Sequence, residues 1–186
     1  MFTWLDADPE GPTSATEFLQ LRRSFGQFTT GVCLVSTVTP EGKREGMTIN
    51  SFASVSLSPP LLLWSVRDAA RSADAFIASR AFTLSILSAD QGALAGHFAR
   101  PAEDKFVAFE DEFEPGLQGC PRLKRALATF ECRTWSRHAE GDHTILVGRV
   151  DAFTQQADLA PLVFSAGRMG SIWELAEASP RPTVTA

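Results

Sequence analysis

A run of small polar side chains at residues 44–60 is the part of this sequence whose composition points most directly to chemistry. It reads REGMTINSFASVSLSPP, with four serines, one threonine and one asparagine, and ends in two prolines. Polar and apolar side chains alternate from Thr48 to Leu57, which is typical of a strand with one donor-rich face. Such a face suits a phosphate, a ribityl chain or a carbonyl-rich ring. The alternative is a strand face in contact with solvent, where serine and threonine are common.

A second polar group follows in SVRDAARSADAF, residues 65–76. Arg71 and Ser72 fall in the first turns of a predicted helix, and Arg67 ends the strand before it. A helix N-terminus with two guanidinium groups beside it can bind an anion. The alternative is an ordinary charged surface on which Asp68 and Asp74 are the partners of the arginines.

The histidines are the remaining candidates. His143 follows Gly141-Asp142 at the start of a predicted strand, where it either contacts a ligand or merely completes a hairpin turn. His97 lies in a predicted helix, and His138 is expected to be exposed. They lack metal-ligand spacing and no thiol pair joins them, so no metal site is predicted. We find no serine elbow and no nucleophile-base pair. The GRMG pattern at 167–170 neither follows a long strand nor opens a long helix, so a Rossmann site is not expected.

Composition narrows the function classes. The 186 residues, 44% hydrophobic and 21% charged, suit one folded domain. A net charge of −5 without a basic run argues against nucleic acid or an anionic membrane as the main partner. No apolar stretch reaches the length of a spanning helix, and the acidic N-terminus lacks a signal-peptide core. Cys33, Cys120 and Cys132 include no CxxC pair, so we expect buried thiols and a cytoplasmic location.

The elements that must position these residues follow from periodicity. We expect a flexible leader at 1–14, a single domain at 15–175 and a flexible tail at 176–186. Phe18, Leu21, Phe25 and Phe28 recur at helical spacing, with Thr13 or Ser14 as the cap. Two further helices are predicted, at 69–80 and 88–99, and residues 99–122 are expected to be rich in loops. Strands are predicted in segments 31–57 (two, about a turn at 40–42), 59–66, 81–87, 125–139, 143–153 and 161–167.

Most of these strands are linked by hairpins. A doubly wound parallel sheet would require strand-helix-strand alternation throughout. The pattern therefore favours a mainly β fold with helices (α+β), an antiparallel barrel with short helices at its openings.

Several of these segments, taken in order, resemble one known family. MTINSFASVSLSPPLLLWSV, AFTLSILSADQGALAGHFA, DKF and EGDHTILVGRVDAF are similar to the short-chain flavin reductases, proteins with an FMN-binding split-barrel fold. The resemblance runs from about Phe18 to Gly170. The TINSFASVSLSPP block and the GDH before a strand are its specific features.

The resemblance implies a set of flavin contacts. The stretch Met47, Thr48, Ile49, Asn50, Ser51 and Phe52 would wrap the flavin ring and ribityl chain. Ser65, Val66 and Arg67 would follow the pyrimidine edge through their backbone, and Arg71 and Ser72 would lie near the phosphate. Phe98 and Phe106 match positions that line the site. His143 would lie by the nicotinamide, while His97 is either near the flavin or on the surface.

The reaction implied is hydride transfer from C4 of NADH or NADPH to N5 of FMN or FAD, for which the protein need only align two rings. Reduced flavin would then serve a partner oxygenase, and the family is usually homodimeric. The sequence departs from the family pattern at Phe164 and Ser165, and the bulky Trp64 is expected to narrow the site. The alternatives are a flavin carrier or sensor without turnover, and a split-barrel oxidase acting on another substrate.

Overall fold

The computed structural model describes residues 14–156 and 158–177 of the chain. Almost all of the leader and most of the tail expected from the sequence lie outside the described residues. The helices are α1 (Ala15–Phe25), α2 (Ala73–Ala78), α3 (Gly92–Phe98) and α4 (Ile172–Glu177), with 3-10 turns η1 (Ala89–Gln91), η2 (Val107–Glu112) and η3 (Leu117–Gly119). The strands are β1 (Thr30–Gly31), β2 (Cys33–Val38), β3 (Arg44–Ile49), β4 (Ala53–Leu57), β5 (Pro60–Arg67), β6 (Ala81–Ile86), β7 (Phe113–Pro115), β8 (Pro121–Leu123), β9 (Ala128–Glu140), β10 (His143–Gln155), β11 (Val163–Ser165) and β12 (Arg168–Gly170).

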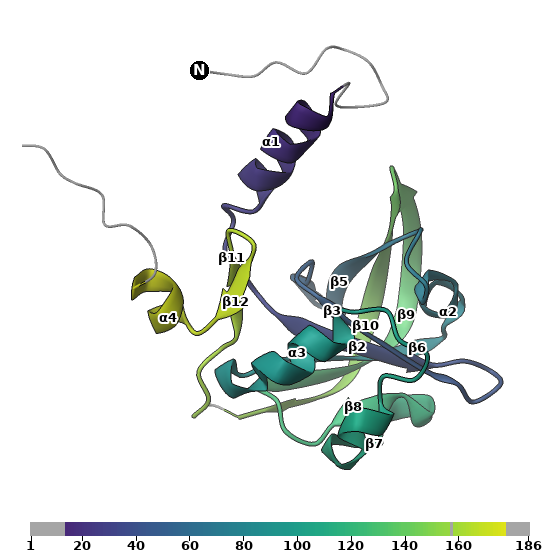
Figure 1. Cartoon of the computed structure of the whole chain (residues 1–186). Coiled ribbons are helices and arrows are strands. Elements are labelled where there is room, and N and C mark those ends of the chain that lie inside the picture. The colour runs from purple at the N-terminus through teal and green to yellow at the C-terminus, as the bar shows by residue number, and fades with distance from the viewer. Residues whose placement is uncertain (1–13, 157, 178–186) are drawn as a thin grey trace, which may run out of the picture.

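Seven of the strands form one antiparallel sheet in the order β3-β2-β6-β9-β10-β5-β4. The two longest strands, β9 and β10, lie at its centre and extend well beyond their neighbours (Figure 1). This sheet is the split barrel, and the mainly β fold expected from the sequence is confirmed. None of the helices within the described ranges has the length and apolarity needed to cross a bilayer.

Two hydrophobic clusters lie on opposite faces of this sheet, because successive strand residues point to opposite sides. On β2, Cys33 and Val35 belong to the inner cluster, whereas Leu34, and Val32 just before the strand, belong to the outer one. The inner cluster fills the barrel around Trp64, whose ring meets two phenylalanines edge-on. The outer cluster lies beneath α3 and the segment from Phe106 to Leu123, the region expected to be rich in loops.

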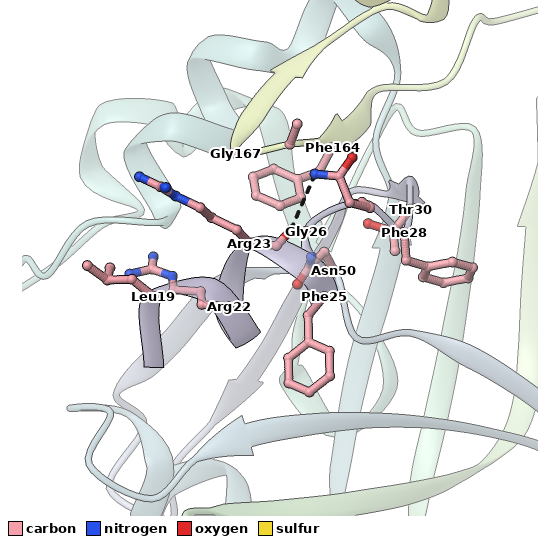
Figure 2. Close-up of a pocket in the computed structure, with 12 residues that line it drawn as sticks. Leu19, Arg22, Arg23, Phe25, Gly26, Phe28, Thr30, Asn50, Phe164 and Gly167 are labelled. Carbon is pink, nitrogen blue, oxygen red and sulfur yellow. Dashed lines mark hydrogen bonds between the residues drawn. The ribbon is translucent and has the colours of Figure 1, made fainter. Parts of the chain in front are cut away.

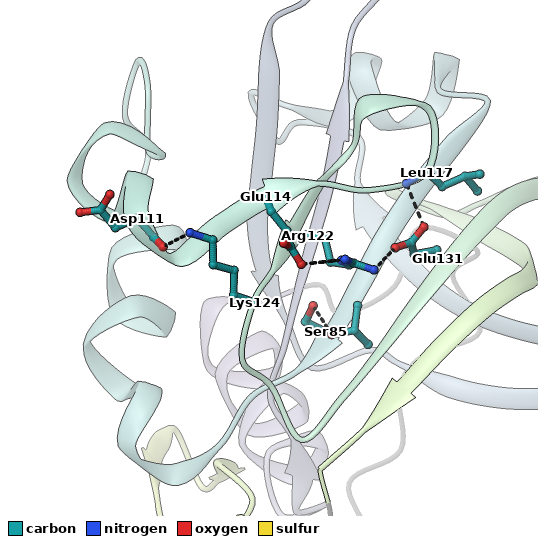
Figure 3. Close-up of polar contacts among 8 residues, drawn as sticks. Ser85, Asp111, Glu114, Leu117, Arg122, Lys124 and Glu131 are labelled. Atoms are coloured by element: carbon teal, nitrogen blue, oxygen red, sulfur yellow. Dashed lines mark hydrogen bonds and ion pairs between the residues drawn. The ribbon is translucent and has the colours of Figure 1, made fainter.

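The short hairpin β7–β8 is held to the sheet by polar contacts (Figure 3). Arg122 bridges Glu114 (2.7 Å) and Glu131 of β9 (2.9 Å), and Glu131 also accepts the backbone N–H of Leu117 (2.9 Å). Lys124 donates to the carbonyl of Asp111 (2.8 Å) on the exposed side of this region. The strand content of 113–123 was missed in the sequence because its pieces are only three residues long.

The N-terminal helix extends away from the barrel (Figure 1). Ser14 caps it, accepting from the N–H of Glu17 at 3.2 Å, as the capping-box spacing predicted. The predicted apolar face is present, but no residue of α1 is buried. Phe18 is 57% exposed and Phe25 is 71% exposed. The helix therefore presents an apolar surface that the single chain leaves uncovered.

Two boundaries differ from the sequence-based expectation. The alternation from Thr48 to Leu57 predicted one strand, and that is wrong: β3 ends at Ile49 and β4 begins at Ala53. The predicted helix 69–80 is only Ala73–Ala78, and a further hairpin, β11–β12, follows at the C-terminal side. Small polar residues continue through the break, but the strict alternation does not, because Ser51 and Phe52 interrupt it.

Candidate functional site

The polar stretch lies at the gap where the barrel is split. β3 and β4 follow each other in the chain, yet they are the two edges of the seven-stranded sheet. Residues 50–52 therefore cross from one edge to the other, and three residues bridge at most about 14 Å. Among the described residues β3 pairs only with β2, so alternate backbone N–H and C=O groups on its other side lie outside the sheet ladder. The gap thus offers both side-chain and backbone groups to a ligand.

The end of β3 is fixed from two sides. Ile49 is 7% exposed and belongs to the inner cluster, whereas Met47 and Thr48 are half-buried. The hydroxyl of Thr48 donates to the carbonyl of Ala95 in α3 at 2.7 Å. Its hydrogen is therefore already used, and toward a ligand this hydroxyl can only accept.

The connection 50–52 is tied to β5. Ser51 Oγ accepts the backbone N–H of Ser65 (3.0 Å) and donates to the Ser65 carbonyl (3.1 Å). The ring of Phe52 stacks on Phe130 of β9 with 6.0 Å between centroids. Asn50 is exposed and makes no side-chain hydrogen bond among the described residues. Its amide is therefore available to a ligand. The two hydrogen bonds between Ser51 and Ser65, which we call the Ser51–Ser65 latch, join the connection 50–52 to β5.

The end of β5 brings the second predicted group to the same place. Val66 is fully buried in the inner cluster, so it can meet a ligand only through its backbone. Arg67 is exposed and lies opposite His143 in the β5–β10 ladder. The structure thus places 47–52, 65–67 and the start of β10 around one gap.

A close-packed aromatic cluster supports β3 from behind. A Cβ on Gly46 would lie 2.8 Å from Phe98 and 2.9 Å from Phe106, so only glycine fits this position. The two rings meet edge-on with 5.1 Å between centroids, and both are buried. Direct flavin contact by Phe98 and Phe106 stays a prediction. The position that the structure gives both rings is that of a support for the strand.

A lysine missed in the sequence completes this support. The half-buried ammonium of Lys105 donates to the carbonyls of Gly46 (3.0 Å) and Phe98 (2.9 Å). Burial lowers the pKa of Lys105; the carboxylate of Glu45 opposes this shift and the guanidinium of Arg71 adds to it. An ammonium has three N–H groups, and two are used here. The available signal was the adjacency of Lys105 to Phe106 in the DKF motif.

Arg71 and Ser72 lie in a turn, where the sequence had predicted the first turns of a helix. That placement is wrong because α2 begins at Ala73, and Ser72 makes no capping hydrogen bond with its side chain. Ser72 Oγ instead lies 3.9 Å from Met47 Sδ, which ties this turn to β3. Arg71 is exposed and has no ion pair within residues 14–156 and 158–177. The positive charges of Arg71 and Lys105, rather than a helix end, are what favour an anion here.

His143 is oriented by its neighbour in the β9–β10 turn. Its Nδ1 donates to the carboxylate of Asp142 at 2.7 Å, and Asp142 also lies 3.5 Å from the guanidinium of Arg67. The hydrogen bond from His143 lowers the pKa of Asp142, and the charges of His143 and Arg67 act in the same direction. With Nδ1 engaged, Nε2 of His143 is the nitrogen left for a ligand.

His97 takes a structural position. Its Nε2 donates to the carbonyl of Lys105 at 2.9 Å, and its ring packs edge-on against Phe98 and Phe109. It thereby holds the segment that carries Lys105 against α3. A direct contact with a flavin stays a prediction.

Trp64 and the three cysteines are buried, so their side chains are not exposed at the gap. Trp64, expected to narrow the site, is wholly buried inside the barrel, so that expectation is wrong. The three thiols are buried, as predicted. Burial raises the pKa of Cys33 and Cys132 to about 12 and that of Cys120 in the same direction. All three are therefore protonated at neutral pH and are poor nucleophiles.

Comparison with known proteins gives consistent results. The family model described as the flavin reductase like domain matches residues 25–172. An FMN reductase (NADH) of Agrobacterium fabrum is 45% identical over 150 residues, which cover 80% of this chain and 83% of that protein. The reductase subunit of a stachydrine N-demethylase of Rhizobium meliloti is 43% identical over 72% of this chain. This chain spans only 57% of that relative's length.

A solved structure shows the same similarity in three dimensions. The NADH:FAD oxidoreductase of Streptomyces globisporus, in complex with NAD and FAD fragments, superposes with a TM-score of 0.77 at 35% sequence identity. The match covers 92% of this chain and 98% of that one.

Proposed function

The chain belongs to the flavin reductase family, and from that membership and the geometry of the gap we infer that it reduces FMN or FAD with NADH or NADPH. The observation that carries this inference is the split between β3 and β4. It combines the open edge of β3, the amide of Asn50 and the cationic pair Arg71 and Lys105. A flavin mononucleotide carries matching groups: a ring with several acceptors, a polyhydroxyl chain and a phosphate.

The residues of the gap fit such a ligand. Lys105, Arg71 and Ser72 would hold the phosphate, because two positive charges lie close enough to affect each other and no carboxylate pairs with Arg71 in the described chain. The backbone of 50–52 and 65–67 would face the ring, since the side chains of Ser51 and Val66 are already committed to the protein. These contacts within the chain are present without a ligand.

Hydride passes between the nicotinamide and flavin rings without a protein nucleophile. The chain's own residues hold the two rings in register and exclude water, which lowers the barrier by removing the cost of bringing two reactants together. Asp142 keeps His143 in one orientation, so that Nε2 can hydrogen-bond to the nicotinamide carboxamide. The thiols of the described residues are buried and protonated, which is consistent with this division of work.

Reduced flavin would then leave to serve a separate oxygenase. The stachydrine relative is a reductase subunit, so its reduced product serves another component. A site in which most protein hydroxyls are already hydrogen-bonded within the chain favours moderate affinity, and moderate affinity suits release. A cytoplasmic location, expected from the cysteine content, stays a prediction.

A second copy of the chain would cover the apolar face of α1. Phe18 and Phe25 are exposed there, and Ile172 and Trp173 of α4 are 52% and 76% exposed. Apolar side chains exposed along one helix usually mark an interface. We therefore propose a homodimer in which α1 packs on the partner.

The experiment for the reductase activity is NADH and NADPH oxidation, followed at 340 nm with added FMN, FAD or no flavin. Turnover that saturates with flavin supports the proposal; flavin binding without oxidation of either nucleotide contradicts it. Lys105→Met should raise the KM for FMN roughly tenfold, because it removes a charge-assisted hydrogen bond. Lys124→Met is the matched control, since Lys124 also donates to a backbone carbonyl but lies near β8.

The dimer is tested separately by sedimentation. Phe18→Asp should yield a monomer, because it places a charge in the proposed interface. Val107→Asp is the control, since Val107 is similarly exposed (69%) on η2. A wild-type monomer at micromolar concentration would refute the dimer and leave the reductase activity untouched.

A further inference from the structure

A methionine lies on the strand that borders the gap, and the proposed reaction makes no use of its sulfur. The chain has three methionines: Met47 on β3, Met169 on β12, and Met1, which lies outside the described residues. Met47 is half-buried and packs against the inner cluster. A thioether has no proton to lose and keeps its lone pairs at every pH. It is therefore open to oxidation where the buried, protonated thiols of this chain are not.

The sulfur of Met47 connects two parts of the gap. Ser72 Oγ donates a weak hydrogen bond to Met47 Sδ at 3.9 Å. Ser72 is 7% exposed and makes no capping hydrogen bond to α2, so its hydroxyl is directed at the sulfur instead. The preceding residue in the same turn is Arg71, one of the two cations proposed to hold the flavin phosphate. A chemical change at this sulfur therefore acts directly on the turn that carries the phosphate site.

Open space lies beside the same end of β3 (Figure 2). Asn50, which follows the strand, is exposed and lines a cavity of about 780 Å³. The opposite wall of this cavity is the C-terminal half of α1, including Arg22 and Arg23. Because Met47 is itself partly exposed, a molecule as small as hydrogen peroxide can reach its side chain from solvent.

The proposed function supplies such an oxidant. Reduced flavin that meets O2 before it meets a partner oxygenase gives O2 two electrons and two protons, which yields oxidised flavin and hydrogen peroxide. A lone pair of the Met47 sulfur then attacks one peroxide oxygen. The S–O bond forms as the O–O bond breaks, and the second oxygen leaves with both protons as water. The thioether is thereby oxidised to a sulfoxide and the peroxide is reduced.

We propose that Met47 is a site of reversible oxidation that weakens flavin binding when reduced flavin is lost to O2. The inference rests on the proposed function, which supplies both the peroxide and the phosphate whose binding changes. A sulfoxide is more polar than a thioether, and here it lies against the apolar inner cluster. The donor that already faces it is the Ser72 hydroxyl, so the turn of Arg71 and Ser72 must shift to accommodate the added oxygen. That shift displaces the phosphate site and leaves the backbone of 65–67, which would face the ring, in place.

The first test treats the wild-type protein with hydrogen peroxide, locates added oxygen by peptide mass spectrometry and measures flavin binding by fluorescence. Oxidation of Met47 should raise the Kd for FMN roughly fivefold, about the effect of one lost hydrogen bond. The Kd for riboflavin, which lacks the phosphate, should be unchanged. Methionine sulfoxide reductases should restore FMN binding. The inference is overturned if Met47 stays unmodified once Met169 is fully oxidised, or if FMN binds an oxidised Met47 protein as tightly as before.

Substitutions assign the effect to one sulfur. Met169→Leu is the matched control, because Met169 is 40% exposed and lies on β12. FMN binding by this variant should remain as sensitive to peroxide as that of the wild type. Met47→Leu nearly conserves volume and should abolish the sensitivity, whatever its own Kd. Met47→Gln places a polar acceptor there without peroxide and should by itself weaken FMN binding but not riboflavin binding. Sensitivity that persists in Met47→Leu contradicts the assignment.

A last measurement separates this inference from the proposed function. During NADH oxidation with FMN in air, sulfoxide should accumulate at Met47, and added catalase should suppress it. Turnover in air that leaves Met47 unmodified overturns the inference alone. Failure of the wild type to reduce either FMN or FAD would refute the proposed function instead.

Discussion

The two regions that meet at Asn50 differ in how far the protein satisfies its own polar groups. Around the gap, Thr48, Ser51 and Lys105 are each hydrogen-bonded to backbone atoms of a neighbouring element. Beside α1, the hydroxyl of Thr30 and the two arginines of the helix's last turn have no such partner in the described chain. The polar groups of the first region are thus satisfied within the chain, whereas the second region leaves its arginines to solvent and the hydroxyl of Thr30 without a partner in the described residues.

Burial separates the two regions in the same way. Behind β3, the rings of Phe98 and Phe106 are 0% and 1% exposed, whereas Phe28 beside α1 is 77% exposed. The first region is therefore packed and hydrogen-bonded within the chain, whereas the second is open to solvent. Four substitutions or titrations test whether this division is real.

The largest effect is expected from truncating the aromatic support. Phe98→Ala should reduce the free energy of unfolding by about 3–5 kcal/mol, because it leaves a cavity in a packed cluster. Phe28→Ala should change it by less than about 0.5 kcal/mol, since that ring is mostly in solvent. Urea denaturation of both variants measures the difference. Equal effects would show that the two regions are not distinct in packing.

The next effect tests the fit of β3 against its support. Gly46→Ala should cost about 1–3 kcal/mol, because the new methyl meets two buried rings. It should also weaken FMN binding, since the edge of β3 must move. Gly96→Ala in α3 is the control, with no atom within 4 Å of the added Cβ. That change should stabilise the protein by about 0.5–1 kcal/mol, because alanine favours a helix. Thermal melts and flavin fluorescence report both quantities.

A smaller loss of stability is expected when the hydrogen bonds between Ser51 and Ser65 are removed. Ser51→Ala removes two hydrogen bonds to the backbone of Ser65, which should cost about 1 kcal/mol. Ser54→Ala, at an exposed position of β4, should cost little by comparison. The decisive quantity is the KM for FMN. A loss of stability without any change in KM would mean that the latch does not shape the gap.

The smallest effect is a pH dependence of phosphate binding. The pKa of Lys105 is lowered, so its ammonium loses its proton at a lower pH than an ordinary lysine does. FMN affinity should therefore fall about two- to fivefold as the pH rises through that pKa. Riboflavin, which lacks the phosphate, should show no such fall. Because folding lowers this pKa, the unfolded chain binds more protons, so this group alone makes unfolding less favourable as pH rises.

The sequence predicted the parts of the fold that depend on periodicity. Hairpin-linked strands and the apolar spacing of α1 were enough for an antiparallel barrel with short helices. The break at 50–52 was overlooked because small polar residues run through it, although Ser51 and Phe52 interrupt the alternation there. Which strands become edges depends on long-range pairing, and pairing leaves no local trace.

The types of residue at the site were predicted better than the positions that these residues take in the structure. Short polar side chains near Asn50 were found because their composition is unusual for a strand. Lys105 was missed because its role depends on contacts with the carbonyls of Gly46 and Phe98, which lie far from it in the chain or on another element. Trp64 was misplaced since a strand end does not reveal which face its side chains take.

The three-residue connection at 50–52 also has a consequence for how the barrel is held shut. It connects β3 and β4, the two edge strands of the sheet, through the main chain. A ligand bound in the gap would add non-covalent contacts between the same two edges. Binding is then linked to folding: at a ligand concentration one hundred times its Kd, a ligand that binds only the folded chain stabilises it by about 2.7 kcal/mol. Amide protons along β3 and β4 would exchange with solvent fastest after flavin departs. The seam between β3 and β4 should therefore be protected best while flavin is bound and least once it has left.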